Sequence, residues 1–426
     1  MKIALITAFP PSRHALNEYG FHVAEQLRHQ PGIELTILGD YLPEPAQGLP
    51  GFHVIRCWGF QRPWNLATVM RAIRAQKPDV AWFNLGFASF GATPVPAILG
   101  LAAPAAARLA GVYSHVTLHQ LFETVDLYDA GVTSPRLYRA GGWLATHLLL
   151  SASSLSVLLP AYRRTLDTKY RRGRVTARSH GIFAGKPEAP DFSQRGNPTH
   201  RILAFGKWGT YKRLELLIDA FHRVAETIPD VELIVGGGDH PKAVGYVESM
   251  ARQHAHDPRL KFLGYVAEAV IPDLFRRASI AVMPYTSSAG SSGVAHLAAQ
   301  YSVPVIASGI RDFRELADHE GIAMRFFTPG DRESLVETLL ALLHSPRERE
   351  QMAWQSHNAA IAMSMPRVIQ DYVRSFRQHQ RVAVLRRMSD LRRNAHHEGD
   401  AALSRSLGQR MQRWQDEDEL TGSPFV

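Results

Sequence analysis

The chain has 426 residues, of which 45% are hydrophobic and 20% are charged, and its formal net charge is +9. This length and polarity suffice to bury two ordinary cores, which argues against a disordered protein and favours two domains. The positive charge favours anionic partners such as a nucleotide, a phospholipid surface or a lipid-linked phosphate. One cysteine, Cys57, excludes an internal disulfide and a cysteine-based metal site, so we expect a reducing compartment, the cytoplasm by default.

The N-terminal segment "MKIALITAF" is too short for the apolar part of a signal peptide, and Pro10 and Pro11 follow it. It predicts a first buried strand. The longest weakly charged run, residues 81–107, contains three prolines. Because proline interrupts a helix, this run favours a buried helix lining a cleft over a membrane-spanning helix.

Strand patterns alternate with helical patterns in both halves of the chain, which is typical of βαβ units around a parallel sheet. A segment rich in Pro, Gly and polar residues at 186–200 separates the halves and is typical of a linker. We expect strands over 2–7, 33–39, 79–85, 112–120, 201–207, 231–238, 260–266, 280–285 and 304–308, and helices over 19–28, 66–76, 213–228, 243–254, 267–277 and 332–343.

These elements predict an α/β fold with two Rossmann-like domains. The boundaries we expect are 1–190 for the first domain and 198–365 for the second. A helix that returns to the first domain, with a basic amphipathic extension, follows over 366–393, and a polar tail over 394–426. Two such domains enclose a cleft, the usual place for a ligand.

Two glycine-containing turns of the second half are candidate phosphate-binding loops. In "GKWGTYK", Gly206 ends a strand, and Lys207 and Lys212 bracket the turn before a helix. In "VELIVGGGDH", a strand leads into three glycines centred on Gly237, where backbone can approach a ligand closely. Such loops at the carboxyl edge of a parallel sheet can meet a diphosphate. On spacing alone, a solvated charged loop explains the two lysines equally well.

A third loop, in "SSAGSSGVAHLAAQYSVPVIAS" (residues 287–308), is small and uncharged. Its hydroxyls and amides, from Gly290, Ser291, Ser292, Gly293 and Val294, can bind ligand hydroxyls or phosphate at the start of a helix.

The order of these segments, with "LKFLGYV" and "PVIAS" between and after them, resembles retaining glycosyltransferases of family 4 (group 1), over roughly residues 1–380. The resemblance implies the GT-B fold, a nucleotide-diphosphate sugar as donor, and a glycan or lipid-linked acceptor. It also implies a metal-independent reaction without a cofactor, and the sequence has no acidic pair of the Asp-x-Asp type in the cleft segments. Nucleic acid is not an expected partner.

The resemblance also implies roles for single residues. His119, just after a strand, would lie near the donor sugar as the catalytic-site histidine, and "ARSHGIF" with His180 would match the family's His-Gly element. A lone histidine is nevertheless often structural. Glu315 would contact the donor, with capping or a surface ion pair as the competing interpretation.

In the first loop, "FPPSRHALNEYG", the family's glycine pair is missing. Arg13, His14 and Asn17 stand there instead and are candidates for the acceptor side. An ordinary helix start is the alternative interpretation.

The main departure from the family lies in the third loop. Two glutamates, eight positions apart, are usual there, and their places are taken by Ala289 and Leu297. Either the enzyme has diverged and remains active, or the chain is an inactive relative that binds a nucleotide sugar as a partner subunit. A third alternative is another GT-B enzyme such as a sugar-nucleotide epimerase, which the order of motifs disfavours. His296 lies next to the second missing acid.

The C-terminal part carries seven arginines and one acid, Asp390, between residues 374 and 393. Apolar residues at helical spacing make this a basic amphipathic helix, which can rest on an anionic membrane at the inner face. A solvated or self-packing helix is the alternative. Taken together, the sequence predicts a cytoplasmic glycosyltransferase of surface polysaccharide or glycolipid synthesis.

Overall fold

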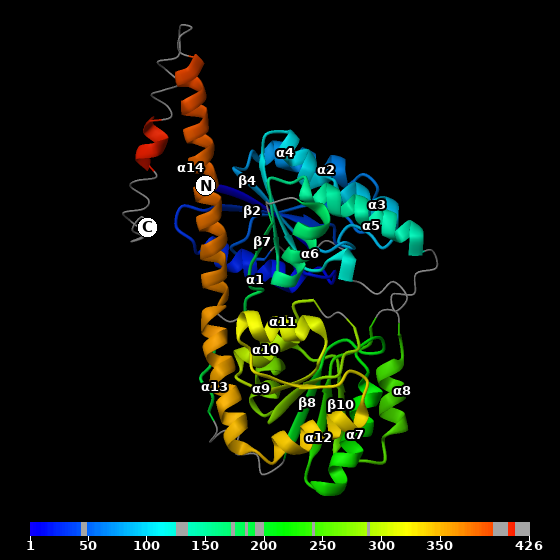
Figure 1. Ribbon diagram of the computed structural model, residues 1–426. Coiled ribbons are helices and arrows are strands. Elements are labelled where there is room, and N and C mark those ends of the chain that lie inside the picture. The colour runs from blue at the N-terminus through cyan, green and yellow to red at the C-terminus, as the bar shows by residue number, and fades with distance from the viewer. Residues whose placement is uncertain are drawn as a thin grey trace.

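The computed structural model describes residues 1–43, 49–124, 135–171, 175–183, 186–191, 200–240, 243–287, 290–394 and 408–413. It contains two α/β domains, one above the other in Figure 1, each built on a parallel sheet covered by helices. The predicted fold class is therefore confirmed.

The first domain has a seven-stranded sheet in the order β3-β2-β1-β4-β5-β6-β7. Its strands are β1 Lys2–Ile6, β2 Glu34–Asp40, β3 Val54–Trp58, β4 Val80–Leu85, β5 Tyr113–Leu118, β6 Ser154–Val157 and β7 Val175–Ala177. Its helices are α1 Asn17–Arg28, α2 Asn65–Gln76, α3 Pro94–Leu101, α4 Ala103–Leu109, the 3-10 helix η1 Phe122–Thr124, α5 Pro135–Leu150 and α6 Pro160–Tyr170. The strand order reverses between β1 and β4, and a crevice opens at the carboxyl ends of strands where such a reversal occurs.

The second domain repeats this plan with six strands in the order β10-β9-β8-β11-β12-β13. The strands are β8 Arg201–Phe205, β9 Glu232–Gly236, β10 Leu260–Gly264, β11 Ile280–Met283, β12 Val305–Ser308 and β13 Met324–Phe327. The helices are α7 Leu214–Thr227, α8 Tyr246–Gln253, the 3-10 helix η2 Glu268–Val270, α9 Ile271–Arg276, α10 Gly293–Gln300, α11 Arg311–Glu320, α12 Arg332–Leu343 and α13 Pro346–Ala362. The reversal here lies between β8 and β11.

Helix α14, Met365–Asn394, starts beside the second domain and runs along the first (Figure 1). Its apolar face, including Ile369, Tyr372 and Phe376, joins a buried cluster with Ile3 and Trp82 of the first sheet. This packing fixes the C-terminal helix onto the first domain.

The apolar run over 81–107 folds differently from our expectation. It forms strand β4 and two short helices, α3 and α4, rather than one buried helix. Prolines at the first turns of both helices lack the N–H that a continuous helix needs. Val95 and Leu109 are 64% and 89% exposed, so these helices are only partly buried. None of the helices in the described part of the chain is both long enough and apolar enough to cross a bilayer.

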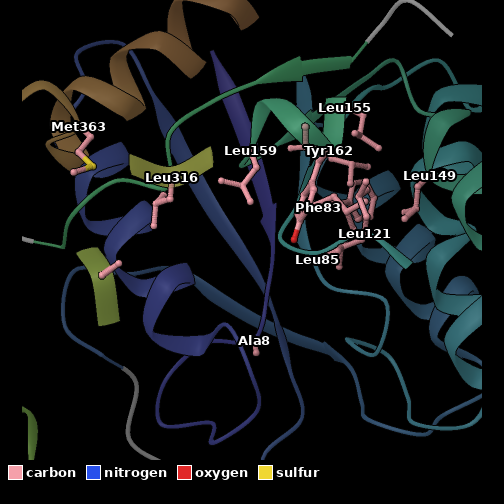
Figure 2. Close-up of a cluster of buried hydrophobic side chains, with 14 of the residues drawn as sticks. Ala8, Phe83, Leu85, Leu121, Leu149, Leu155, Leu159, Tyr162, Leu316 and Met363 are labelled. Atoms are coloured by element: carbon pink, nitrogen blue, oxygen red, sulfur yellow. The ribbon is translucent and has the colours of Figure 1, made fainter. Parts of the chain in front are cut away.

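One apolar core continues from the first domain into the second. Figure 2 shows Phe83, Leu85 and Tyr162 of the first domain in the same cluster as Leu316 of α11 and Met363 after α13. Because interiors are close-packed, this continuity fixes the orientation of the two carboxyl edges that form the junction.

A buried histidine of β5 makes the first domain sensitive to acid. His115 Nδ1 lies 2.7 Å from Ser154 Oγ, and its Nε2 lies 3.0 Å from Ser156 Oγ. Burial, helped by the positive charge of Arg178, lowers the pKa of His115 to about 3. In the unfolded chain, His115 therefore binds a proton near pH 6.5, whereas in the folded chain it stays unprotonated at that pH.

The first prediction concerns this group. The free energy of unfolding should fall as the pH drops below 6.5, with His115 contributing about 1.4 kcal/mol per pH unit until its folded pKa is reached. In His115→Gln, which keeps polar atoms for both serines, the pH dependence should be weaker by about one proton. Urea unfolding of both proteins at pH 7 and pH 5 measures this, and identical pH dependence would show that His115 is not held neutral.

Candidate functional site

The carboxyl edges of the two sheets face each other, and their loops meet between the domains. His119 follows β5 in the first domain, and Gly290 follows β11 in the second. A Cβ atom placed on Gly290 would lie 3.5 Å from the carbonyl oxygen of His119. The predicted catalytic-site histidine and the predicted donor loop are therefore neighbours.

The loops after β8 and β9 approach so closely that two glycines are required. Gly206 has φ 148° and Gly237 has φ 100°. A Cβ atom on Gly237 would lie 1.8 Å from the carbonyl oxygen of Gly206, which no side chain tolerates. One on Gly206 would lie 2.6 Å from Lys212 Nζ, so the ammonium rests directly against this backbone. The structure thus brings together three of the residues predicted to bind the donor.

Lys212 is a partly buried cation, and none of the described residues gives it an acidic partner. Its Nζ lies 4.9 Å from the centre of the Tyr285 ring, a cation–π contact. Burial lowers the pKa of Lys212, and the neighbouring Tyr211 partly opposes this. Within the described residues no carboxylate lies within ion-pair distance of it. A buried ammonium is costly unless a negative group accompanies it, so this site favours an anionic ligand.

Lys207 is exposed, and its positive charge acts on Glu18 of the first domain. Burial and the negative charge of Glu268 raise the pKa of Glu18 in α1, and the charge of Lys207 opposes that rise. The two lysines of the turn therefore lie in different environments. Lys212 packs within the second domain, and Lys207 lies at the junction between the domains.

Three buried hydroxyl groups around these loops have no hydrogen-bond partner among the described residues. They are Thr210 Oγ1, Tyr285 OH and Ser291 Oγ. Buried polar atoms are nearly always paired, so unpaired ones need an explanation such as a missing ligand or water. All three follow β8 or β11, the strands on either side of the sheet's reversal point. They mark the place where a polar ligand would be bound.

The start of helix α10 provides further donors. Ser292 is buried and caps the helix, its Oγ accepting from the Ala295 N–H at 3.4 Å. Gly293 and Val294 occupy the first two helical positions, and the described residues supply no acceptor for their N–H groups. Free N–H groups at a helix start attract anions. Ser292 thus organises the loop, whereas Gly293 and Val294 remain available to a ligand.

Of the two positions where the family usually has a glutamate, the structure describes only one. Ala289 lies outside the described residues. Leu297 lies on α10 and packs against the apolar core that spans both domains. The Leu297 side chain is therefore partly buried at the edge of the apolar core, and it offers a ligand no polar contact.

His119 is buried and neutral. Burial lowers its pKa to about 3. Its Nε2 lies 2.6 Å from Asn84 Oδ1, and Asn84 Nδ2 donates to Thr7 Oγ1 at 3.0 Å. With the amide oriented this way, Nε2 carries the proton and Nδ1 keeps its lone pair. At neutral pH His119 can form hydrogen bonds with a ligand but cannot act as an acid.

A buried carboxylate, that of Glu320, connects three segments at the domain junction. Its Oε1 accepts from the backbone N–H of His180, which lies in the crossing segment, at 3.2 Å. Its Oε2 lies 2.8 Å from His296 Nε2 in α10. His296 Nδ1 lies 2.7 Å from the carbonyl oxygen of Ser292. We call Glu320, His296 and His180 the junction triad.

His296 of this triad is a buried imidazolium. Both of its ring nitrogens face groups that only accept hydrogen bonds, so both must carry protons. Burial alone would lower the pKa of His296, but the charge of Glu320 and the hydrogen bonds to Glu320 and Ser292 outweigh it and raise the pKa. The ring of His180 lies 4.5 Å away and stays neutral, because burial and the charge of His296 lower its pKa. His296 therefore faces Glu320, not the ligand space beside the missing acid.

Helix α11 makes two further contacts to the first domain. Asp312 Oδ2 accepts from the Gly290 N–H at 3.0 Å and from Tyr162 OH of α6 at 3.2 Å. Glu315 forms an ion pair with Arg164 of α6. Of the alternatives considered for Glu315, the ion pair is the one found, so its carboxylate is already occupied in this structure.

The first loop is organised around Asp40, a buried carboxylate at the end of β2. It accepts from the Phe9 N–H at 3.1 Å and from Ser12 Oγ, and His14 Nδ1 lies 2.6 Å from it. Asn17 Nδ2 donates to the Ser12 carbonyl oxygen at 2.6 Å. Of the three residues predicted for the acceptor side, His14 and Asn17 thus hold the loop together, and Arg13 is exposed.

Four residues that shape this site could not be predicted from the sequence: Asp40, Tyr285, Asp312 and Glu320. Each acts through a partner distant in sequence, for example Asp312 with Tyr162, so no local motif points to it. Within the described residues, no cluster of three or more His, Cys, Asp or Glu side chains is arranged to hold a metal ion.

Comparison with known proteins supports the identity of the second domain. Residues 199–345 match the family model described as glycosyl transferases group 1. No curated protein sequence matches the chain. The predicted resemblance to group 1 glycosyltransferases is thus confirmed over residues 199–345.

Solved structures match over most of the chain. Sucrose-phosphate synthase from Thermosynechococcus elongatus has a TM-score of 0.71 and 15% identity, covering 89% of this chain and 99% of that one. HepE from Anabaena, in complex with UDP-glucose, has a TM-score of 0.64 and 17% identity, covering 89% and 100%. WaaG, a glycosyltransferase involved in lipopolysaccharide biosynthesis, has a TM-score of 0.58 and 15% identity, covering 87% and 98%. The chain therefore has the GT-B fold.

The second prediction tests the junction triad. Glu320→Gln leaves the His296 imidazolium buried without a counter-charge and should cost about 3–5 kcal/mol of unfolding free energy. His296→Gln in the same chain removes that charge, so the double variant should be destabilised by clearly less than the sum of the two single variants. Urea unfolding of the four proteins at pH 7 measures the cycle, and strictly additive costs would contradict the ion pair.

Proposed function

We propose that the protein is a glycosyltransferase that moves a sugar from a nucleotide-diphosphate donor to a glycan or lipid-linked acceptor. The observation that carries this proposal is the partly buried, desolvated ammonium of Lys212, which has no acidic partner among the described residues and lies near the unpaired hydroxyls of Thr210, Tyr285 and Ser291. Such a set fits a diphosphate with sugar or ribose hydroxyls beside it. The match of this domain to group 1 glycosyltransferases supports the same conclusion.

In the proposed reaction, negative charge builds on the departing diphosphate as the bond to the sugar breaks. Lys212 and the free N–H groups of Gly293 and Val294 would stabilise this charge, with Lys207 at the mouth of the site. Preorganised donors of this kind are among the largest contributions to catalysis. Because these groups can supply the positive charge themselves, we propose that neither a metal ion nor a cofactor is needed.

His119 would act on the donor sugar as a neutral hydrogen-bonding group. Its low pKa keeps Nδ1 unprotonated throughout the physiological range, and its place beside Gly290 puts it at the donor loop. The retaining course of the reaction is proposed from the resemblance to family 4.

The hydroxyl groups would replace the contacts that the two usual glutamates make. Ser291 Oγ lies in the same loop as the first missing acid, and Tyr285 OH and Thr210 Oγ1 lie in adjoining loops. A hydroxyl can donate and accept, so it can bind sugar hydroxyls without a charge. Leu297 leaves the ribose with one polar contact fewer, which we expect to weaken donor binding.

For the acceptor we propose a glycan or lipid-linked acceptor of surface polysaccharide or glycolipid synthesis, bound on the first-domain side near Arg13. Arg13 is exposed, and the described residues offer it no ion-pair partner. WaaG supports this proposal as a structural neighbour. We also propose a cytoplasmic location, with peripheral contact at the inner membrane face through residues 374–393.

The alternative function is a catalytically impaired relative that binds a nucleotide sugar and acts as a partner subunit. The apolar Leu297 in place of an acid favours this alternative. Release of nucleoside diphosphate from a panel of nucleotide sugars, with lipid and glycan acceptors present, separates the two. Turnover supports the transferase, and tight binding without turnover toward any acceptor supports the partner subunit.

The third prediction tests the phosphate site. Lys212→Gln should weaken binding of the nucleoside diphosphate about 10- to 100-fold, because it removes charged hydrogen bonds from a partly desolvated site. Arg213→Gln is the matched control, since Arg213 is exposed and paired with Glu215. Isothermal titration with UDP, GDP and ADP measures both variants. Unchanged affinity in Lys212→Gln, or an equal loss in the control, would refute the assignment.

A further inference from the structure

A cavity of about 630 Å³ lies at the opposite edge of the first sheet, away from the domain junction. Met1, Asp79 and Tyr113, at the amino ends of β1, β4 and β5, form its floor. Helix α14 forms one wall. Because ligands of the transferase would bind at the carboxyl edges, this cavity is separate from the proposed donor site.

Five arginines line this cavity and only one acid does. They are Arg108 at the end of α4, Arg377 and Arg387 on α14, and Arg410 and Arg413 in the short helix over 408–413. The acid, Asp79, already accepts from the Lys2 N–H at 2.8 Å. We call the cavity that these five arginines line the arginine cavity.

None of the five arginines forms an ion pair with a described residue. Arg108 donates to the Ser151 carbonyl oxygen at 3.1 Å, and Arg377 donates to the Pro31 carbonyl oxygen at 2.8 Å. Elsewhere on the surface, exposed arginines such as Arg374 have acidic neighbours. Like charges gathered in one hollow repel each other, and an anion between them relieves that repulsion.

A hollow lined by five arginines suits a phosphate group. Arginine binds phosphate oxygens with paired, directional hydrogen bonds that a lysine cannot reproduce. The volume far exceeds that of one water molecule, so a substituted phosphate fits.

Exposed apolar side chains next in sequence to cavity-lining residues point to the source of the phosphate. Leu109, next to Arg108, is 89% exposed, and Leu385, next to the cavity-lining Val384, is 53% exposed. Exposed apolar residues beside arginines are typical of surfaces that contact a membrane interface. A freely soluble phosphate ligand would give no reason for them.

We propose that the arginine cavity binds the phosphate of an anionic phospholipid headgroup and holds this edge of the first domain on the membrane surface. Leu109 and Leu385 enter the interface beside the bound headgroup. This inference deepens the membrane contact proposed above for residues 374–393 and rests on that part of the proposed function, while the cavity itself lies outside the donor and acceptor loops.

The test uses the full-length protein and vesicles of phosphatidylcholine with or without phosphatidylglycerol. Arg377→Gln/Arg387→Gln removes two charges from the cavity. Arg374→Gln/Arg386→Gln removes two from the same helix outside the cavity and is the matched control. The cavity variant should lose about thirtyfold in affinity for anionic vesicles, and the control about threefold or less. Equal thermal unfolding midpoints would show that both variants fold.

Titration with inorganic pyrophosphate, monitored by calorimetry, separates a headgroup from a free phosphate. Cavity-dependent binding to anionic vesicles but not to neutral ones supports the proposal. Cavity-dependent binding of pyrophosphate without vesicle binding would overturn the lipid assignment. Equal losses in the two variants, or no binding to either probe, would overturn the cavity as a phosphate site.

Discussion

The carboxylate of Glu320 is the interaction on which the arrangement of the site depends. It ends helix α11 inside the protein and bonds both to the crossing segment, through the His180 N–H, and to helix α10, through His296. His296 in turn bonds to the carbonyl oxygen of Ser292, the residue that caps α10. One buried charge thus sets the donor helix relative to the chain that joins the domains. Because a buried charge without its partner is costly, this arrangement has little freedom to shift.

At the domain junction, some charged and polar groups have partners within the protein, and others have none among the described residues. His296 and Glu320 satisfy each other, and Asp312 is bonded to the donor loop and to Tyr162. Lys212 and the hydroxyls around it remain unmatched within the described residues. Of the six buried side-chain atoms without a hydrogen-bond partner among the described residues, three belong to the loops after β8 and β11, and the other three, on Glu123, Arg178 and His357, lie elsewhere. This contrast, more than any single residue, locates the proposed donor site and explains how it can work without acids in the donor loop.

Sequence patterns predicted the features that depend on local rules. Alternating strands and helices indicated two parallel sheets, and glycines after strands indicated close loop contacts, which Gly206 and Gly237 make. Short strands such as β3, β6 and β7 were not predicted, because runs of three to five residues are too short to show a clear periodicity. The split of the 81–107 run into α3 and α4 also went unpredicted, although its prolines contained the signal.

Partners far apart in sequence were beyond such patterns. Nothing in the local sequence indicates that His296 pairs with Glu320 or that Asp40 organises the first loop, since each pairing exists only once the chain has folded. For the same reason, Glu315 and Ser292 could be placed near the donor loop from the order of motifs, but their ion-pair and capping roles required the structure.

In the proposed donor complex, a nucleoside diphosphate binds against Lys212 and the start of α10. A crystal structure with whichever of UDP, GDP or ADP binds most tightly tests it directly. The account predicts phosphate oxygens within hydrogen-bond distance of Lys212 Nζ and of the Gly293 and Val294 N–H groups, with the hydroxyls of Thr210, Tyr285 or Ser291 on the same ligand. A nucleotide bound elsewhere, or one whose phosphates leave Lys212 untouched, would contradict it.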